Sequence, residues 1–289
     1  MSANYFLIQQ GVRWLKATLR GSTRLCDTRG MQLQDILFSQ GFGTRRVCAG
    51  LVQQGLVQVY ESNEALAPVP CAQSATEFVA EGLRFRVQGV DWPYHEKAYV
   101  MLNKPTNTEC SQKPSTHPSI YTLLPSPLRL RPQKGAVQGV QAVGRLDQDT
   151  TGLLLLTDDG KFIHRMSSPR HHVPKVYEVT VKHPLDEAQV NKLLAGVVLD
   201  DDPKPVRAAA CEAVSSHHLR LTLTEGKYHQ VKRMISAVGN RVEEEGGLHR
   251  SRVGDLALPA DLMPGGWRWL TAEALLAISP AGKTPATAG

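Results

Sequence analysis

The spacing of apolar residues changes along the chain, and the first change predicts a small N-terminal domain. Residues 33–37 place leucine and isoleucine three to four positions apart, as on one face of a helix. The glycines of residues 41–43 interrupt this helix, and Thr44 is a suitable N-cap for a second one. Residues 56–60 then alternate between apolar and polar side chains, as in a strand. Two helices and a strand in this order predict a domain over residues 31–90.

A longer and more varied set of elements predicts a second domain over residues 96–278. Strands are expected at 99–102, 152–157, 176–181 and 219–224, and helices at 161–167, 186–194 and 229–238. Residues 114–139 are rich in proline, serine and glycine, and we expect a loop with short elements there. Single helices between strands, without a repeating βα unit, favour an α+β fold with a mixed sheet.

The two ends of the chain lie outside these domains. Residues 1–30 form a segment with five basic side chains and a single acid: Arg13, Lys16, Arg20, Arg24 and Arg29 against Asp27. We expect a basic arm here, with a transit peptide or a true start at Met31 as alternatives. Residues 279–289 contain no large apolar side chain, which predicts a flexible tail.

Composition changes this picture little. The 289 residues are 42% hydrophobic and 21% charged, which is ordinary for a globular protein. The net charge of +6 favours an anionic partner, but residues 1–30 supply +4 of it, so local clusters must carry any argument for RNA binding. No stretch approaches the ~20 apolar residues of a membrane helix. The five cysteines lack the C-x-x-C spacing of a zinc site, and we expect reduced thiols in a cytoplasmic protein.

Four segments indicate the function more strongly than composition does, because their sequences and their order along the chain match one set of motifs. Residues 144–160 read GRLDQDTTGLLLLTDDG, residues 175–179 KVYEV, residues 225–234 EGKYHQVKRM and residues 248–254 LHRSRVG. In this order they resemble the motifs of the RNA pseudouridine synthases. The N-terminal helices and strand resemble the S4 RNA-binding domain of one branch of that family. The resemblance covers about residues 31–275 and implies a small S4-like domain followed by a mixed-sheet catalytic domain.

The resemblance implies an isomerase with one catalytic carboxylate. In the family's reaction the N1–C1′ bond of uridine breaks, the uracil rotates, and C5 joins C1′. Since no redox change or hydrolysis occurs, no cofactor and no metal are expected. The catalytic residues would be Asp147 as nucleophile, Lys232 as the cation that keeps it ionised, and Tyr177 as the ring that stacks on the base. Whether the carboxylate attacks the sugar or the base, or assists removal of a sugar proton, stays open.

The resemblance also implies contacts with RNA. Arg145 is expected to hold the target nucleotide outside the base stack, because a stacked uridine does not expose its C5 and C1′. Further substrate-binding residues are expected at Lys227, His229, Gln230 and Arg233, and S4-like RNA-binding residues at Thr44, Arg45 and Arg46. Two departures from the family pattern stand out. Gln32 or Gln34 replaces a basic residue of the first S4 helix, and Lys232 stands where arginine is frequent.

Several of these residues also have an ordinary structural interpretation. Asp147 can cap a turn or pair with Arg145, and Arg145 can instead pair with Asp149 or Asp158. Tyr177 can be a half-buried tyrosine of a strand. The arginines of the second N-terminal helix can be solvated side chains without a partner.

Other polar segments are weaker candidates. Residues 161–175 carry four lysines or arginines and no acid, which predicts a basic surface beside the catalytic motif, with a solvated loop as the alternative. The histidines at 171 and 172 lack partner ligands at metal spacing and are expected at the surface. Residues 158–160 predict a turn, and residues 200–202 a solvated loop.

The expected substrate rests on resemblance alone. Residues 168–172, 225–234 and 237–242 look most similar to the small-subunit enzymes of the S4-bearing branch, which implies 16S ribosomal RNA in an assembling small subunit as partner of a monomeric protein. A uridine of 23S ribosomal RNA is the alternative. A non-catalytic S4-type factor would have a degraded site, and a glycoside hydrolase needs two carboxylates that flank a sugar bond. Residues 243–247 look like an acidic insertion whose effect on RNA docking stays open.

Overall fold

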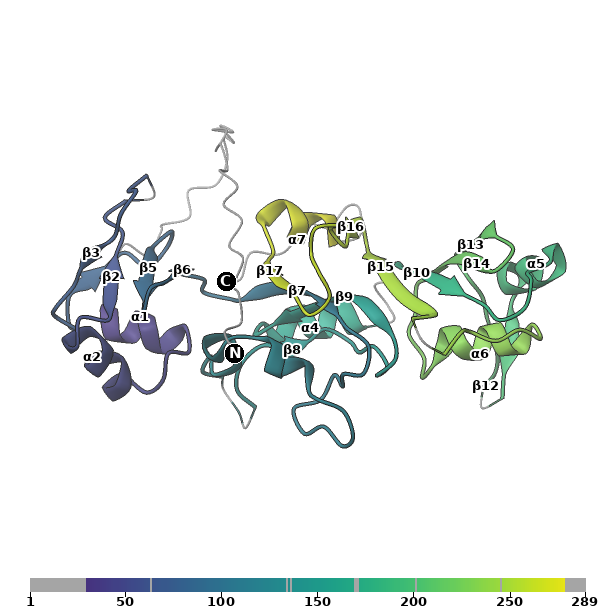
Figure 1. The fold of residues 1–289 in the computed structure, drawn as a ribbon, viewed down its shortest axis with the longest axis horizontal. Helices are drawn as coiled ribbons and strands as arrows, with labels where there is room; N and C mark the ends of the chain where they lie inside the picture. The colour runs from purple at the N-terminus through teal and green to yellow at the C-terminus, as the bar shows by residue number, and fades with distance from the viewer. Residues whose placement is uncertain are drawn as a thin grey trace.

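The N-terminal part of the chain folds around a hydrophobic core of its own, at one end of the molecule in Figure 1. Its elements are β1 (Met31–Gln32), α1 (Leu33–Ser39), α2 (Arg45–Gln53), β2 (Val57–Val59), β3 (Val69–Pro70), β4 (Glu77–Phe78), β5 (Arg84–Val87) and β6 (Val90–Pro93). Four strands pair antiparallel in the order β3-β2-β5-β6, and β1 pairs with β4. The helix, helix and strand predicted from the apolar spacing are confirmed.

The computed structural model describes residues 30–278, except 63, 134, 136, 169–171, 201 and 245. The basic arm expected over residues 1–30 lies outside the described residues apart from Gly30, and the tail expected over 279–289 lies outside them entirely.

The apolar spacing of the N-terminal part works as the sequence predicts. Leu33, Ile36 and Leu37 point from α1 into the core and are fully buried. The Thr44 hydroxyl accepts a hydrogen bond from the Val47 backbone N–H at 3.3 Å, which caps α2. The local pattern therefore determines both helices and the break between them.

The larger part of the chain is built on a mixed sheet. Its strands are β7 (Tyr99–Lys104), β8 (Gln141–Ala142), β9 (Thr151–Thr157), β10 (Lys175–Thr180), β13 (Ala210–Ser215), β14 (His218–Leu223), β15 (Leu248–Val253), β16 (Leu256–Ala257) and β17 (Trp267–Trp269). The main order is β13-β14-β10-β15-β9-β7-β17, with β8 beside β9 and β16 beside β15. The pairing of β9 with β15 is parallel, whereas β9 with β7 and β10 with its two neighbours are antiparallel. The predicted mixed sheet is confirmed.

Strand β9 is buried on both faces, which explains its continuous run of four leucines. Leu154 and Leu156 face one core together with Val100 and Leu102 of β7. Leu153 and Leu155 face a second core on the other side of the sheet. Side chains alternate across a strand, so an uninterrupted apolar run requires cover on both sides.

Helices supply that cover. They are η1 (Ile120–Leu123), α3 (Ser126–Arg129), α4 (Gly160–Ser167), α5 (Glu187–Ala195), α6 (Gln230–Ala237) and α7 (Ala272–Ile278). Buried residues of α3, α5 and α6 belong to one core, and those of α4 and α7 to the other. The three longer helices predicted here are confirmed within two residues at each end. Asp186 starts α5 through a capping box with Gln189.

The structure corrects the expectation for one acidic segment and adds to the expectation for another. Residues 200–202 were expected to form a solvated loop, but Asp202 begins β12 (Asp202–Val206), which pairs with β11 (Val197–Leu199) in a hairpin. Its prolines at 203 and 205 are tolerated because β12 has β11 as its one partner strand among the described residues. The chain does bend at residues 158–160, but Asp159 caps α4 and Asp158 is a buried ion-pair partner of Arg131.

Among the described residues, no helix has the length and apolar character needed to cross a bilayer.

Candidate active site

Asp147 lies in the loop that connects β8 to β9. Gly144 near the start of this loop has φ +72°, a left-handed conformation that glycine adopts at little cost. The Thr150 backbone N–H donates to the Asp147 carbonyl at 3.1 Å and closes a turn. Leu146 packs into the core, whereas the Asp147 side chain remains 30% exposed. The carboxylate therefore lies at the edge of the core, within reach of a ligand.

A buried lysine that the sequence analysis missed holds this loop in place. Lys104, the last residue of β7, is fully buried. Its Nζ donates to the backbone carbonyls of Gln148 at 3.1 Å, Thr150 at 2.9 Å and Pro105 at 3.0 Å. Burial lowers the Lys104 pKa to about 8, while the nearby Asp149 and Asp147 carboxylates act to raise it. The only sequence signal was a lysine at the end of an apolar strand.

Two basic side chains of the α6 region approach the Asp147 carboxylate. His229 Nε2 lies 3.5 Å from Asp147 Oδ1, and Lys232 Nζ lies 3.8 Å from Asp147 Oδ2. Lys232 is closer to a different acid, because its Nζ donates to both carboxylate oxygens of Asp149 at 2.6 Å. The structure therefore makes Asp149 the direct ion-pair partner of Lys232, with Asp147 as its second neighbour.

Most of the residues expected at the site line one pocket of about 100 Å³. The expected residues that line it are Arg145, Asp147, Tyr177, Lys227, His229 and Gln230. Tyr177 comes from β10 and is 9% exposed. The pocket thus lies where the Asp147 loop, β10 and the start of α6 meet.

The start of α6 is shaped by a strained residue and a buried amide. His229 has φ +47°, uncommon for a residue with a side chain, and its ring stacks on Tyr228 with centroids 3.9 Å apart. Gln230 is 4% exposed; its Oε1 accepts from the Lys227 N–H at 2.8 Å and its Nε2 donates to Glu225 Oε1 at 2.9 Å. Gln230 therefore holds the loop that presents Lys227 to the pocket.

Of the two arginines predicted to bind substrate, Arg145 lines the pocket and Arg233 does not. Arg145 is exposed, and within the described part of the chain it forms no ion pair. The alternative pairing of Arg145 with Asp149 or Asp158 is wrong, because Asp149 pairs with Lys232 and Asp158 with Arg131. Arg233 does not line the pocket; its Nη1 donates to the Tyr228 carbonyl at 3.2 Å.

The residues expected to contact RNA through an S4-like surface lie in the N-terminal part, away from the pocket. Thr44 is the N-cap of α2, and Arg45 and Arg46 are its first two residues. The Arg45 Nε donates to Asp35 Oδ1 at 2.5 Å, and its guanidinium lies 4.2 Å from the centre of the Phe38 ring. Both arginines are exposed, but Arg45 is paired with Asp35, so Arg46 is the more available cation of the two.

The basic run over residues 161–175 is only partly on the surface. Lys161 is exposed and Arg165 half-buried on α4, while residues 169–171 lie outside the described residues. Lys175 is not an open surface cation: its Nζ donates to the Val173 carbonyl at 3.1 Å, and burial lowers its pKa to about 8. The predicted basic surface is therefore smaller than the sequence run suggests.

A larger hollow of about 470 Å³ lies at the acidic insertion. It is lined by Thr180, Lys182 and residues 241–244, and contains none of the expected catalytic residues. The insertion is tied to β10, because the Glu243 N–H donates to the Thr180 carbonyl at 2.9 Å. As for metals, the described ranges hold no cluster of three or more His, Cys, Asp or Glu side chains that could bind one.

Comparisons with known proteins identify the class to which this fold and pocket belong. Residues 98–237 match the family model described as RNA pseudouridylate synthase. A solved structure described as a pseudouridylate synthase shares 31% identity and a TM-score of 0.57, covering 86% of this chain and 99% of the other. The chain therefore belongs to the RNA pseudouridylate synthase family and is an enzyme.

Curated relatives make the likeness more specific. Over 180 residues the chain is 44% identical to the ribosomal small subunit pseudouridine synthase A of Yersinia pestis, covering 62% of this chain and 72% of the relative. Over 184 residues it is 42% identical to the protein of the same name from Escherichia coli strain K12, covering 64% and 75%.

Proposed function

We propose that this enzyme converts one uridine of ribosomal RNA, in the 16S RNA of the small subunit, to pseudouridine. The observation that carries the proposal is the convergence of Asp147, Tyr177 and His229 on one pocket, with Lys232 beside the Asp147 carboxylate but outside the pocket lining. The relatives at 42–44% identity, both named for the ribosomal small subunit, support the choice of RNA. A uridine of 23S RNA is the alternative substrate.

In this proposal Asp147 is the nucleophile: its carboxylate forms a temporary bond to the target nucleotide, and this bond breaks again before the product leaves. The N1–C1′ bond breaks, C5 bonds to C1′, the C5 proton is lost and N1 gains a proton, so the reaction is an isomerisation. His229 Nε2 lies 3.5 Å from Asp147 Oδ1 and the Lys232 ammonium 3.8 Å from Asp147 Oδ2, so both side chains stand beside the carboxylate while it reacts. Lys104 holds the Asp147 loop in place, which reduces the reorganisation needed when the Asp147 carboxylate forms its bond to the nucleotide.

Tyr177 stacks on the target base, and Arg145 holds the extruded nucleotide. The pocket volume of about 100 Å³ is far below the ~300–1,000 Å³ of sites for drug-sized ligands, which favours a single flipped base as its occupant. Lys227, His229 and Arg233 contribute positive or hydrogen-bonding groups around the phosphates, and Gln230 shapes the loop. The chemistry requires no cofactor.

The N-terminal part acts as an S4-like RNA-binding domain. Thr44, Arg45 and Arg46 lie together at the start of α2, and arginines near a helix N-terminus suit phosphate contacts. The enzyme would act as a monomer on an assembling small subunit, which places it in the cytoplasm.

The test of the substrate uses purified enzyme with 16S RNA, 23S RNA and partly assembled small subunits, all from a strain that lacks the corresponding activity. Pseudouridine is then mapped by mass spectrometry. We expect one new pseudouridine in 16S RNA, most efficiently in the assembling particle. A new pseudouridine in 23S RNA alone would contradict the 16S assignment, and its absence from every RNA would contradict the proposed function.

A further inference from the structure

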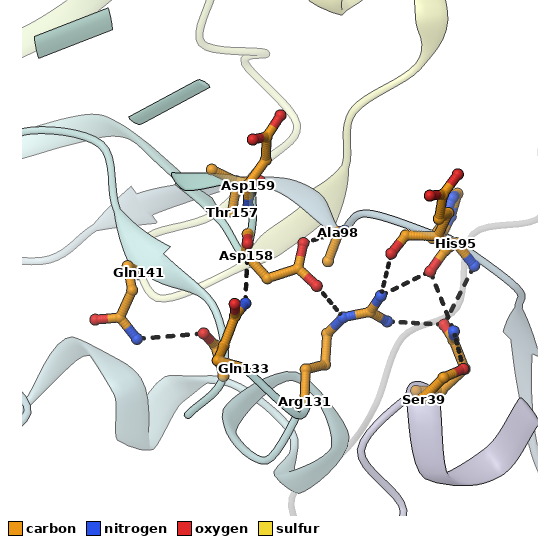
Figure 2. Close-up of polar contacts among 12 residues, drawn as sticks. Ser39, His95, Ala98, Arg131, Gln133, Gln141, Thr157, Asp158 and Asp159 are labelled. Carbon is orange, nitrogen blue, oxygen red and sulfur yellow. Dashed lines mark hydrogen bonds and ion pairs between the residues drawn. The ribbon is translucent and has the colours of Figure 1, made fainter. Parts of the chain in front are cut away.

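One buried arginine joins the N-terminal part of the chain to the catalytic part. Arg131 follows α3 and is 2% exposed. Its Nε donates to Asp158 Oδ2 at 2.7 Å and its Nη1 to Gln40 Oε1 at 2.8 Å. Its Nη2 donates to the carbonyls of His95 at 2.6 Å and Glu96 at 3.1 Å. Figure 2 shows the guanidinium between Asp158 on one side and His95 on the other.

The acceptors come from three separate segments. Gln40 is the C-cap of α1 in the N-terminal part, His95 and Glu96 belong to the connection, and Asp158 follows β9 in the catalytic part. We call the contacts of Arg131 with these three segments the joint. The Gln40 amide strengthens the joint, because its Nε2 donates to the His95 carbonyl at 3.1 Å and its Oε1 accepts from the His95 N–H at 3.2 Å.

A second contact shows how closely the two parts approach. Gly41 has φ +89°, and a Cβ atom there would lie 2.1 Å from the Pro127 carbonyl oxygen and 2.8 Å from the Arg131 backbone nitrogen. Only glycine fits both the conformation and the space. The end of α1 therefore rests directly on the backbone of the catalytic part.

This joint is suited to fixing an orientation. Domains of one chain usually move relative to each other unless their interface is large and apolar. An apolar contact tolerates small slides, whereas any slide here would leave a buried donor or acceptor without its hydrogen-bond partner, which is unfavourable. The buried Arg131–Asp158 pair also stays favourable only while all its partners remain in place.

Strand β9 connects this joint to the active site. Its seven residues run from the Asp147 loop at one end to Asp158 at the other. At ~3.3 Å per residue the strand spans roughly 23 Å. Because β9 is buried and paired on both sides, it acts as a rigid spacer between Asp147 and the joint.

We propose that Arg131 is a positioning residue that holds the N-terminal part at a fixed distance from Asp147, so that the enzyme selects RNAs able to occupy both at once. The inference rests on the proposed function, because it takes RNA as the substrate. It predicts that loosening the joint weakens recognition of long RNA without changing the chemistry at Asp147.

Gln40→Ala is the most selective test, because it removes the bond to the N-terminal part and leaves the Arg131–Asp158 pair intact. The double variant Arg131→Met with Asp158→Asn removes both buried charges and avoids leaving one unpaired. Gln53→Ala, at the exposed end of α2, is the matched control, since it truncates the same side chain away from the joint. Each variant is assayed on a long 16S fragment and on a short stem-loop that holds only the target uridine.

We expect Gln40→Ala to raise KM for the long RNA about tenfold with kcat nearly unchanged, since lost preorganisation weakens binding. On the short stem-loop, both constants should match those of wild type and of Gln53→Ala. An unchanged KM on the long RNA for both joint variants would overturn the proposal. Equal losses on the two RNAs would also overturn it, since they would show local damage to the catalytic part.

Small-angle X-ray scattering of the free proteins separates this proposal from the proposed function. Wild type and Gln53→Ala should share one distribution of interatomic distances with one defined maximum dimension. In Gln40→Ala and the double variant this distribution should be broader, because the two parts of the chain can change their distance. A wild-type enzyme inactive on both RNAs would refute the proposed function. The scattering would still show whether the joint fixes the N-terminal part relative to the catalytic part. An identical distribution for all four proteins would show that Arg131 does not fix the domains.

Discussion

Lys232 places one ammonium group between two carboxylates of the same loop. It lies 2.6 Å from Asp149 and 3.8 Å from Asp147, and only Asp147 lines the pocket. Asp149 thus holds the lysine in position, while Asp147 faces the pocket. A lysine lacks the planar fork with which an arginine would bind one carboxylate through two nitrogens. One Nζ bridging two acids is an arrangement suited to lysine.

Replacing Lys232 with methionine should lower kcat by about 100-fold, because the positive charge beside the reacting carboxylate is lost. Lys232→Arg retains the charge and should keep most of the activity. Steady-state kinetics on 16S RNA measures both variants, with Lys192→Met on the exposed face of α5 as the control. Wild-type kcat in Lys232→Met would show that the lysine is only a structural partner of Asp149.

The sequence predicted the residues that line the pocket better than the residues that support it. Asp147, Tyr177 and His229 belong to recognisable segments, and the structure brings them together. Lys104 and Arg131 were missed because their importance depends on burial and on partners far along the chain. A lysine at the end of a strand looks like any solvated lysine until its surroundings are known.

At the scale of elements, β9 is the strand on which the architecture depends. It pairs antiparallel with β7 and parallel with β15, and its two faces contribute to two cores. The parallel pairing requires a close approach at Gly152, where φ is +103° and an added Cβ would lie 2.3 Å from the Arg250 carbonyl oxygen. Glycine is therefore required near the start of this strand.

Gly152→Ala should lower the free energy of unfolding by about 2–4 kcal/mol, because the methyl group collides with backbone and the conformation is strained. Urea unfolding measures the change. Gly160→Ala is the control, since it stands at the start of α4 with open space around it and without positive φ. Its stability should stay within about 1 kcal/mol of wild type. Equal stability of the two variants would contradict the role given to Gly152.

The elements with regular apolar spacing were predictable, and those with irregular spacing were not. Four leucines indicated β9, helical spacing indicated α1, and helical spacing together with an N-cap residue indicated α2 and α5. The β11–β12 hairpin was missed because two prolines and three aspartates resemble a loop, and its pairing is a non-local property. The order of the strands in the sheet is likewise set by contacts that no single segment encodes.

At the scale of the whole molecule, the joint between the two parts contains a half-buried histidine. His95 Nε2 is buried without a hydrogen-bond partner in the described structure, and the ring lies 4.3 Å from that of Trp269. Desolvation, assisted by the Arg131 charge, lowers the His95 pKa to about 4, and Asp158 opposes the shift. Between pH 6.5 and about 4, the folded protein therefore keeps His95 neutral, whereas the unfolded chain binds a proton there.

This lowered pKa predicts a pH dependence of stability. Between pH 6.5 and about 4 the unfolded state binds more protons at His95 than the folded state does. The contribution of His95 to the free energy of unfolding is therefore full above pH 6.5 and is lost as the pH falls toward 4. His95→Phe should remove up to about one proton from the slope of unfolding free energy against pH. Urea titrations at several pH values measure it, with His217→Asn, on an exposed turn, as the control. An unchanged slope in His95→Phe would contradict the burial of a neutral ring.

The relative placement of the two parts was not predictable from the sequence. Gln40 and Arg131 are 91 positions apart, and neither belongs to a distinctive motif. The local patterns predicted two domains but could not predict that a buried guanidinium would join them. Domain orientation depends here on a few long-range hydrogen bonds rather than on the apolar pattern.

The central claim is that Asp147 performs the isomerisation, and the most direct test replaces only its charge. Asp147→Asn keeps the shape of the side chain, and Asp255→Asn, at an exposed turn, is the matched control. Both proteins, folded to the same degree by circular dichroism, are incubated with 16S RNA from cells that lack the activity, and pseudouridine is quantified by mass spectrometry. We predict wild-type modification by Asp255→Asn and none by Asp147→Asn. Pseudouridine formed by Asp147→Asn at the wild-type rate would contradict the account.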